Sequence, residues 1–258
     1  MQLNKNNGWL GIWPSRGLKG ILDPENNRIE RFLEDSIKLI KSNSRILDAG
    51  AGKCPYKKIF QDFHYESMDM PGGFYKNIHT FESHLSSMPV KDERYDVVVL
   101  TQVLEHLDNP KEVLLEINRV LKPNGILLLS VPLNGPIHGE PFHFFQFTHY
   151  GLDELATQSN FYIQEIEKIG GGFWFIGKRL PALLRSLMKS NDPFRAKKRN
   201  QNVLKISAIF LSLIPIWVFL YLPAAYIIRP VFYWLDILDR EKSLTTGYTS
   251  IFKKINGN

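Results

Sequence analysis

The residues best suited to chemistry lie in one short segment, RILDAGAGKCPY, at residues 45–56. Its apolar start predicts a buried strand that ends at Asp48. Gly50 and Gly52 follow, and glycine is required where the backbone takes a positive φ or approaches a ligand with no Cβ in between. The segment therefore predicts a strand and a glycine turn that form the binding site of a nucleotide-like cofactor.

A second segment supplies the acid that a bound ribose requires. Residues 65–70 read YESMDM and predict a short strand that ends in Asp69, next to Met70. A carboxylate at this place can accept hydrogen bonds from both ribose hydroxyls. The dinucleotide fingerprint G-x-G-x-x-G would need a third glycine where Pro55 stands, so a nicotinamide cofactor is disfavoured.

Residues 88–132 carry the resemblance to a known family. They read MPVKDERYDVVVLTQVLEHLDNPKEVLLEINRVLKPNGILLLSVP, with a VLEH segment, an RVLKPNG turn and a strand that ends in proline. Together with D-x-G-x-G and an acid 17 residues after Gly52, this run resembles the type 11 methyltransferase domain of the class I S-adenosylmethionine-dependent methyltransferases. The resemblance covers roughly residues 30–170.

The resemblance implies S-adenosyl-L-methionine as the cofactor. Thr101 and Gln102, after the fourth strand, should line its methionine side. On the adenine side the family often has an acid, and here His84 stands at that position, followed by Leu85. The residues expected at the cofactor are thus Asp48, Gly50, Gly52, Asp69, Met70, His84, Leu85, Thr101 and Gln102.

The loop at residues 132–148, PLNGPIHGEPFHFFQFT, is the expected acceptor side. It resembles a loop with the pattern H-x-x-P-x-D-x-x-R-x-T in members of the family that act on sugars and bacterial glycans. His138 matches the first histidine, whereas His143 replaces the acid and Gln146 the arginine. A histidine can take a hydroxyl proton near neutral pH, so His138 and His143 are the predicted catalytic bases.

Other chemistry-bearing residues have weaker assignments. His106, in the segment VLEHL, is expected beside the cofactor in a supporting role. Cys54 is the single cysteine, which excludes a disulfide framework and a multi-cysteine metal site and fits a reducing compartment. No residue is assigned to a metal.

The expected elements alternate between strands and helices, which predicts an α/β fold. The predicted helices are 24–42, 55–62, 110–121 and 151–159, and the predicted strands are 45–49, 65–69, 77–81, 95–100, 126–131, 162–169 and 247–255. The fold class is a Rossmann-like, seven-stranded, mostly parallel sheet with an antiparallel last strand, plus an apolar helical insertion before that strand. Residues 1–177 with 243–256 form the methyltransferase domain, and residues 178–240 form the insertion.

The insertion is basic and then apolar. Residues 178–205 hold nine Lys or Arg against one Asp, and residues 206–228 hold no charge. The whole chain carries +6, so the remainder is slightly acidic and a nucleic-acid partner is disfavoured. The insertion fits a hairpin or in-plane element on an anionic membrane surface. The alternative is a lid or the interface of a homodimer. A single span is disfavoured because it would separate strand 247–255 from its sheet.

The predicted function is S-adenosylmethionine-dependent O-methylation of a sugar, glycan or lipid-linked saccharide, a small-molecule or lipid-linked acceptor. The predicted localisation is cytoplasmic, peripheral or monotopic on the inner face of the cytoplasmic membrane, since the first twenty residues contain no secretory signal. Two alternatives stay open. One is methylation of a quinone or polyprenyl-type lipid, and the other is a non-catalytic, membrane-bound module of a glycan-assembly complex.

Overall fold

The structure of the chain, a computed structural model, describes residues 24–73, 75, 78–190, 219 and 222–255. The chain divides into two units. Among the described residues, the first unit comprises Glu25–Ile169 and the segment from Thr245 onward, and the second comprises Gly170–Leu244 together with Pro24. The two are described separately below.

The first unit is built on a seven-stranded sheet with the order β3-β2-β1-β4-β5-β7-β6. Strand β7 pairs antiparallel with both β5 and β6, and the other pairs are parallel, so the predicted fold class is confirmed. The chain runs outward from β1 to β2 and β3 on one side and from β4 to β5 on the other. Ligands of such sheets bind at this reversal, beyond the carboxyl ends of the strands. The strands are β1 Arg45–Ala49, β2 His64–Asp69, β3 Phe81–Glu82, β4 Tyr95–Thr101, β5 Leu121–Pro132, β6 Phe161–Ile169 and β7 Gly247–Lys254.

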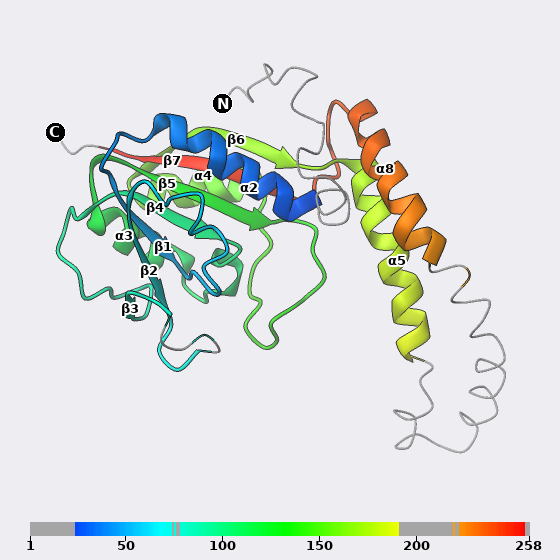
Figure 1. Ribbon diagram of the computed structural model, residues 1–258, viewed down its shortest axis with the longest axis horizontal. Helices are drawn as coiled ribbons and strands as arrows, with labels where there is room; N and C mark the ends of the chain where they lie inside the picture. The colour runs from blue at the N-terminus through cyan, green and yellow to red at the C-terminus, as the bar shows by residue number, and fades with distance from the viewer. Residues whose placement is uncertain (1–23, 74, 76–77, 191–218, 220–221, 256–258) are drawn as a thin grey trace. The chain divides into compact units, whose positions relative to one another are not determined.

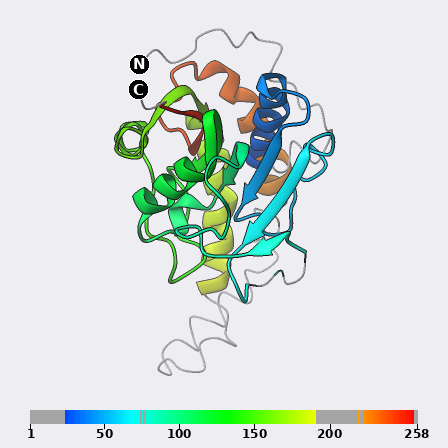
Figure 2. The same ribbon diagram turned by 90° about the vertical axis from the view of Figure 1, so that its left-hand side faces the viewer.

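In the part of the first unit that the structure describes, three helices cover this sheet: α2 Pro24–Ser36, α3 Pro110–Val120 and α4 His149–Gln158. Figures 1 and 2 show α2 on one face and α3 and α4 on the other. Helix α3 begins as its sequence predicts, because the Asn109 side chain accepts the Glu112 N–H and Pro110 occupies the first turn. The apolar stripe of α3 is buried against the sheet, and so the central strands are covered on both faces.

Three predicted elements differ from the structure. The predicted helix 55–62 is wrong, because the segment is a run of turns with i to i+3 hydrogen bonds. Tyr56 and Phe60 of this segment are buried, and the chain must reach the start of β2 within a few residues of them. The predicted strand 77–81 is replaced by β3, a two-residue edge strand with only one apolar side chain. The predicted helix 24–42 ends earlier, in the short 3-10 helix Ile37–Leu39, before Asn43 takes a positive φ.

The second unit contains α5 Gly172–Ser190, the π-helical turn Ala224–Ile228, α8 Arg229–Leu235 and the 3-10 helix Asp236–Leu238. Helices α5 and α8 lie side by side (Figure 1). Gly177 permits their close approach, because a Cβ there would lie 2.7 Å from Phe232 Cβ. The buried carboxylate of Asp236 accepts the N–H groups of Gly171 and Trp174, at 2.9 Å for the shortest bond to each, and thereby caps the start of α5.

Most of the apolar insertion lies outside the described residues. Of residues 206–228 the structure describes 219 and 222–228, and the basic segment is described only as far as residue 190. Within the described part of the chain, every helix is too short or too polar to cross a bilayer. The assignment of residues 178–240 to an insertion stays a prediction.

Replacing Asp236 by alanine should destabilise the second unit. The substitution removes the acceptor of two buried N–H groups, which costs about 1–3 kcal/mol. Hydrogen exchange at residues 171–175 should accelerate and Tm should fall. Asp236→Asn keeps one acceptor oxygen and should have the smaller effect. Unchanged exchange in Asp236→Ala would show that the carboxylate does not hold α5.

Candidate functional site

The glycine turn follows β1 at the carboxyl edge of the sheet. Gly50 and Gly52 have φ values of +70° and +53°. A Cβ at Gly50 would lie 2.8 Å from a methyl group of Val103, so this position has no room for a side chain. The N–H groups of Gly50 and Ala51 both donate to the Met68 carbonyl at 3.0 Å. The backbone of the turn is therefore fixed against the end of β2, with the strand register of β1 and β2 behind it.

Asp69 joins the end of β2 to this turn. Its Oδ2 accepts the Gly52 N–H at 2.9 Å, and its Oδ1 accepts the Met70 N–H at 2.7 Å. Each carboxylate oxygen has a second lone pair, so Asp69 can still accept the hydroxyls of a ribose. The structure thus brings Gly52 and Asp69 together as predicted, while the Met70 side chain is exposed.

Asp48, at the end of β1, is a buried carboxylate. Tyr65 Oη donates to its Oδ2 at 2.6 Å, and 1% of the residue is exposed. Burial raises the pKa of Asp48 to about 6, although the bond from Tyr65 acts in the opposite direction. The ionised form lacks a salt-bridge partner among the described residues. A ligand that brings a cation to this strand end would stabilise it.

The other predicted cofactor residues lie around the same edge. Thr101 ends β4 half-buried, and Gln102 has a φ of +53° and donates its backbone N–H to Ser130 at 2.9 Å. His84 is exposed, with a backbone oxygen that accepts from Ser87 N at 3.1 Å, and Leu85 packs against the core. The backbone of Gln102 is thereby joined to β5, and its side chain also reaches Ser130, at 3.3 Å.

Sequence reasoning missed a histidine beside the glycine turn. The His79 side chain is 2% exposed, with its Nε2 3.9 Å from Asp69 Oδ2 and its Nδ1 3.8 Å from Cys54 Sγ. Tyr75 also approaches the turn, and the Lys53 ammonium lies 5.5 Å from the centre of its ring. The predicted strand 77–81 concealed His79, because it placed this residue in a strand rather than in a loop.

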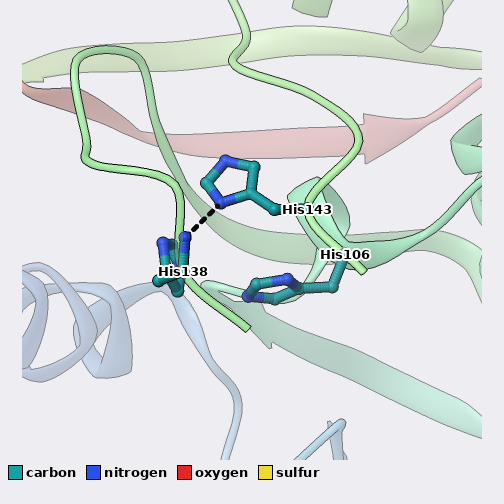
Figure 3. Close-up of side chains that lie close together, drawn as sticks. All are labelled: His106, His138 and His143. Atoms are coloured by element: carbon teal, nitrogen blue, oxygen red, sulfur yellow. Dashed lines mark hydrogen bonds between the residues drawn. The ribbon is translucent and has the colours of Figure 1, made fainter. Parts of the chain in front are cut away.

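Three histidines meet beyond the carboxyl ends of β4 and β5 (Figure 3). His106 comes from the short 3-10 helix Leu104–His106 after β4, and His138 and His143 come from the loop after β5. The ring of His138 lies 4.8 Å from that of His106 and 4.5 Å from that of His143, between centroids. The backbone N–H of His138 donates to Nδ1 of the His143 ring at 3.2 Å. Gly139, with a φ of +64°, lets the loop lie against the His106 ring.

A buried carboxylate, Glu105, lies beneath this histidine cluster (His106, His138 and His143). Its side chain has no exposed surface, and neither oxygen has a hydrogen-bond partner in the described part of the chain. Burial raises the pKa of Glu105 to about 7. Its Oε1 is 3.8 Å from His106 Nε2 and 4.0 Å from His138 Nε2. The sequence analysis selected His138 and His143, whereas it missed Glu105 and gave His106 only a supporting role.

Comparison with known proteins agrees with this arrangement. A family model described as a methyltransferase domain matches residues 25–167. A Mycolicibacterium smegmatis protein described as an S-adenosylmethionine-dependent methyltransferase is 30% identical over 99 residues, 35% of this chain and 38% of that protein. A Mycobacterium tuberculosis protein of the same description is 27% identical over 124 residues, 43% and 45% of the two chains. The chain thus spans less than half the length of these relatives.

Solved structures show the same fold at low sequence identity. The cyclase SpnF has a TM-score of 0.53 at 17% identity, covering 93% of this chain and 95% of that one. A Galdieria sulphuraria protein described as a sarcosine dimethylglycine methyltransferase has a TM-score of 0.52 at 16% identity, covering 90% and 86%. A likeness of this kind establishes fold and not reaction, as the cyclase illustrates.

The matched family region contains β1, β2, β4 and α3, and therefore the glycine turn, Asp69 and Glu105. The cofactor of this family is S-adenosyl-L-methionine, and the turn, the acceptor oxygens of Asp69 and the buried Asp48 fit that molecule. On the family match and the fold, the chain belongs to the class I S-adenosylmethionine-dependent methyltransferases.

Proposed function

We propose that this protein transfers a methyl group from S-adenosyl-L-methionine to an oxygen atom of a saccharide: a sugar, a glycan or a lipid-linked saccharide. The observation that carries the proposal is the histidine cluster at the same sheet edge as the glycine turn. A hydroxyl group needs a nearby group that takes its proton as the new bond forms, and imidazole does so near neutral pH.

In this proposal, each of the cofactor residues contacts a different part of S-adenosyl-L-methionine. The bound cofactor supplies a methyl group activated on its sulfonium. Asp69 accepts from the ribose hydroxyls, and the glycine turn lets the backbone approach without a Cβ in the way. Asp48, buried and without a cationic partner in the described residues, accepts the ammonium of the methionine part. Thr101, the last residue of β4, and Gln102 directly after it line the methionine side.

His138 and His143 take the acceptor's proton in this proposal. They lie in a loop whose start is held by the residue before β7, because Leu133 N and Asn134 N both donate to the Thr246 carbonyl. Orientation of the acceptor against the methyl group can lower the barrier by up to about 7–11 kcal/mol, more than one base supplies. The loop therefore has a positioning role as well as a proton-accepting one.

We propose a location at the inner face of the cytoplasmic membrane. Support comes from the second unit, where Tyr226, Ile227 and Trp234 are each at least 61% exposed, beside the basic segment of the sequence. Aromatic and apolar side chains of this kind favour the membrane interface, and Lys and Arg favour its anionic lipids. A lid or a homodimer interface would use the same surface. A quinone or polyprenyl-type lipid acceptor is the alternative within the same chemistry.

Gly50→Ala should weaken cofactor binding by about tenfold or more, since 1.4 kcal/mol corresponds to tenfold. The new Cβ would press on Val103 and displace the turn. Isothermal calorimetry with S-adenosylmethionine measures the effect. Gly72→Ala is the matched control, because Gly72 also has a positive φ, +72°, but its Cβ would meet nothing within 4 Å. Equal losses in both variants would assign the effect to backbone strain rather than to the collision.

Asp48→Asn should separate stability from binding. The pKa of Asp48 is about 6 in the folded chain, above its ordinary value of 3.8. The free energy of unfolding therefore falls as pH rises between these two values. Above pH 6 the loss is complete and amounts to up to about 3 kcal/mol. Asparagine keeps an acceptor for Tyr65 without the charge. Tm should therefore rise at pH 8 and approach that of the wild type near pH 4, while affinity for S-adenosylmethionine falls roughly tenfold. Asp62→Asn, at an exposed carboxylate, is the control, and unchanged affinity would contradict the ammonium contact.

The acceptor class is tested with a tritiated methyl group on the cofactor. Label should enter an extracted lipid-linked saccharide fraction and not a quinone fraction. The double variant His138→Ala, His143→Ala should lower the rate by about 10²–10⁴-fold with cofactor affinity retained. His64→Ala, an exposed histidine at the start of β2, should match the wild type. Full transfer by the double variant, or label in quinone alone, would overturn the proposal.

A further inference from the structure

The negative charge of an ionised Glu105 is not compensated by a hydrogen-bond donor in the described part of the chain. Its carboxylate is fully buried, and both oxygens lack a hydrogen-bond donor in the described part of the chain. A buried carboxylate without partners is strongly destabilising unless a proton or a cation neutralises it. The groups that face it are imidazoles rather than lysine or arginine. Such a carboxylate has the surroundings of a ligand rather than of a salt bridge.

Two of the imidazoles are oriented like metal ligands. His106 Nδ1 donates to the Phe142 carbonyl at 2.5 Å, and His138 Nδ1 donates to the Pro136 carbonyl at 3.1 Å. In the neutral rings this leaves lone pairs on both Nε2 atoms, which face Glu105 Oε1 at 3.8 and 4.0 Å. Lone pairs and a carboxylate oxygen repel each other unless a positive centre lies among them. Metal-binding histidines typically donate the other N–H to a backbone carbonyl, as these two do.

His143 completes the cluster. Its Nε2 is buried without a hydrogen-bond partner in the described residues, and one ring nitrogen from each of the three histidines lies within 4.8 Å of the others. Nitrogen and oxygen ligands of a tetrahedral zinc, bound at about 2.0–2.1 Å, lie roughly 3.4 Å apart. The two Nε2–Oε1 distances, 3.8 and 4.0 Å, exceed that spacing by about half an ångström. To bind the same cation, the His143 ring must either lose its hydrogen bond from the backbone N–H of His138 or rotate. Its position on a loop allows such a movement.

We propose that Glu105, His106 and His138, with His143 as the third imidazole, bind one divalent transition-metal cation. Neutral imidazoles with one carboxylate suit zinc, iron, cobalt or nickel, whereas magnesium prefers an all-oxygen shell. The His138 side chain is 47% exposed, so one side of the cation faces solvent and can accept an oxygen ligand. Resting on the proposed function, that oxygen belongs to the acceptor hydroxyl; the cation lowers the pKa of that hydroxyl, and its proton passes to solvent on the exposed side, because metal-bound imidazole nitrogens can no longer accept it.

Cobalt(II) is the probe, because its visible absorption reports coordination directly. Metal-free full-length protein, prepared by dialysis against a chelator, is titrated with Co²⁺ alone. One equivalent should produce a tetrahedral or five-coordinate absorption band, which Zn²⁺ removes and excess Mg²⁺ does not. His106→Ala, His138→Ala and Glu105→Gln should each weaken binding at least about tenfold. Calorimetry with Zn²⁺ gives the affinities independently of any methyl transfer.

His64→Ala is the matched control and should bind Co²⁺ like the wild type. Thermal unfolding identifies any variant that fails to fold; His138→Ala, at a half-exposed loop position, tests the proposal if Glu105→Gln unfolds. The proposal is overturned if wild-type protein gives no band, or if His138→Ala and His64→Ala bind equally. The proposed methyl transfer would stand in that case, provided that label still enters the saccharide fraction, because a metal-free imidazole can serve as the base.

Discussion

The site depends on one backbone interaction, the acceptance of two N–H groups by the Met68 carbonyl at the end of β2. Gly50 and Ala51 both donate to it, and Asp69 holds Gly52 immediately beyond. These bonds fix the carboxyl ends of β1 and β2 at one level, next to the β1–β4 boundary at which the strand order reverses. Opening the turn toward a ligand would break these three hydrogen bonds. The cofactor site is therefore rigid because the sheet is, and the loops around it carry whatever adaptation the acceptor requires.

Much of this half of the site could be predicted from the sequence, because its signals are local. Buried parallel strands read as short apolar runs, and the glycines and Asp69 follow them directly. Residues 55–62 misled the prediction because proline and an apolar pair suit a helix start, whereas the short return to β2 allows only turns. β3 misled it as well, since an edge strand of two residues has no periodicity to detect.

The acceptor half could be predicted only in part. His138 and His143 stand in a loop that resembles a family pattern, but the sequence does not bring that loop to the end of β4. Tertiary contact does so: Phe144 N and Phe145 N both donate to the Glu105 carbonyl oxygen. From the sequence alone, Glu105 looks like an ordinary acidic residue of the protein surface. Only the structure shows that it is completely buried, and its burial is what marks it as important. Burial of a charge is a property of the fold, not of the local sequence.

The place of β7, between β5 and the edge strand β6, has a consequence for the order in which the protein folds during synthesis. β7 lies between β5 and β6, yet it is synthesised after both of them and after the whole second unit. Pro132, at the end of β5, can pair with Gly247 only once β7 has been made. Until then β6 has no neighbour in the sheet and the histidine loop has no anchor at Thr246. Pairings between segments so distant in the chain form slowly. The nascent chain should therefore complete its glycine turn early, whereas the loop that carries His138 and His143 gains its anchor only after β7 has been synthesised and paired.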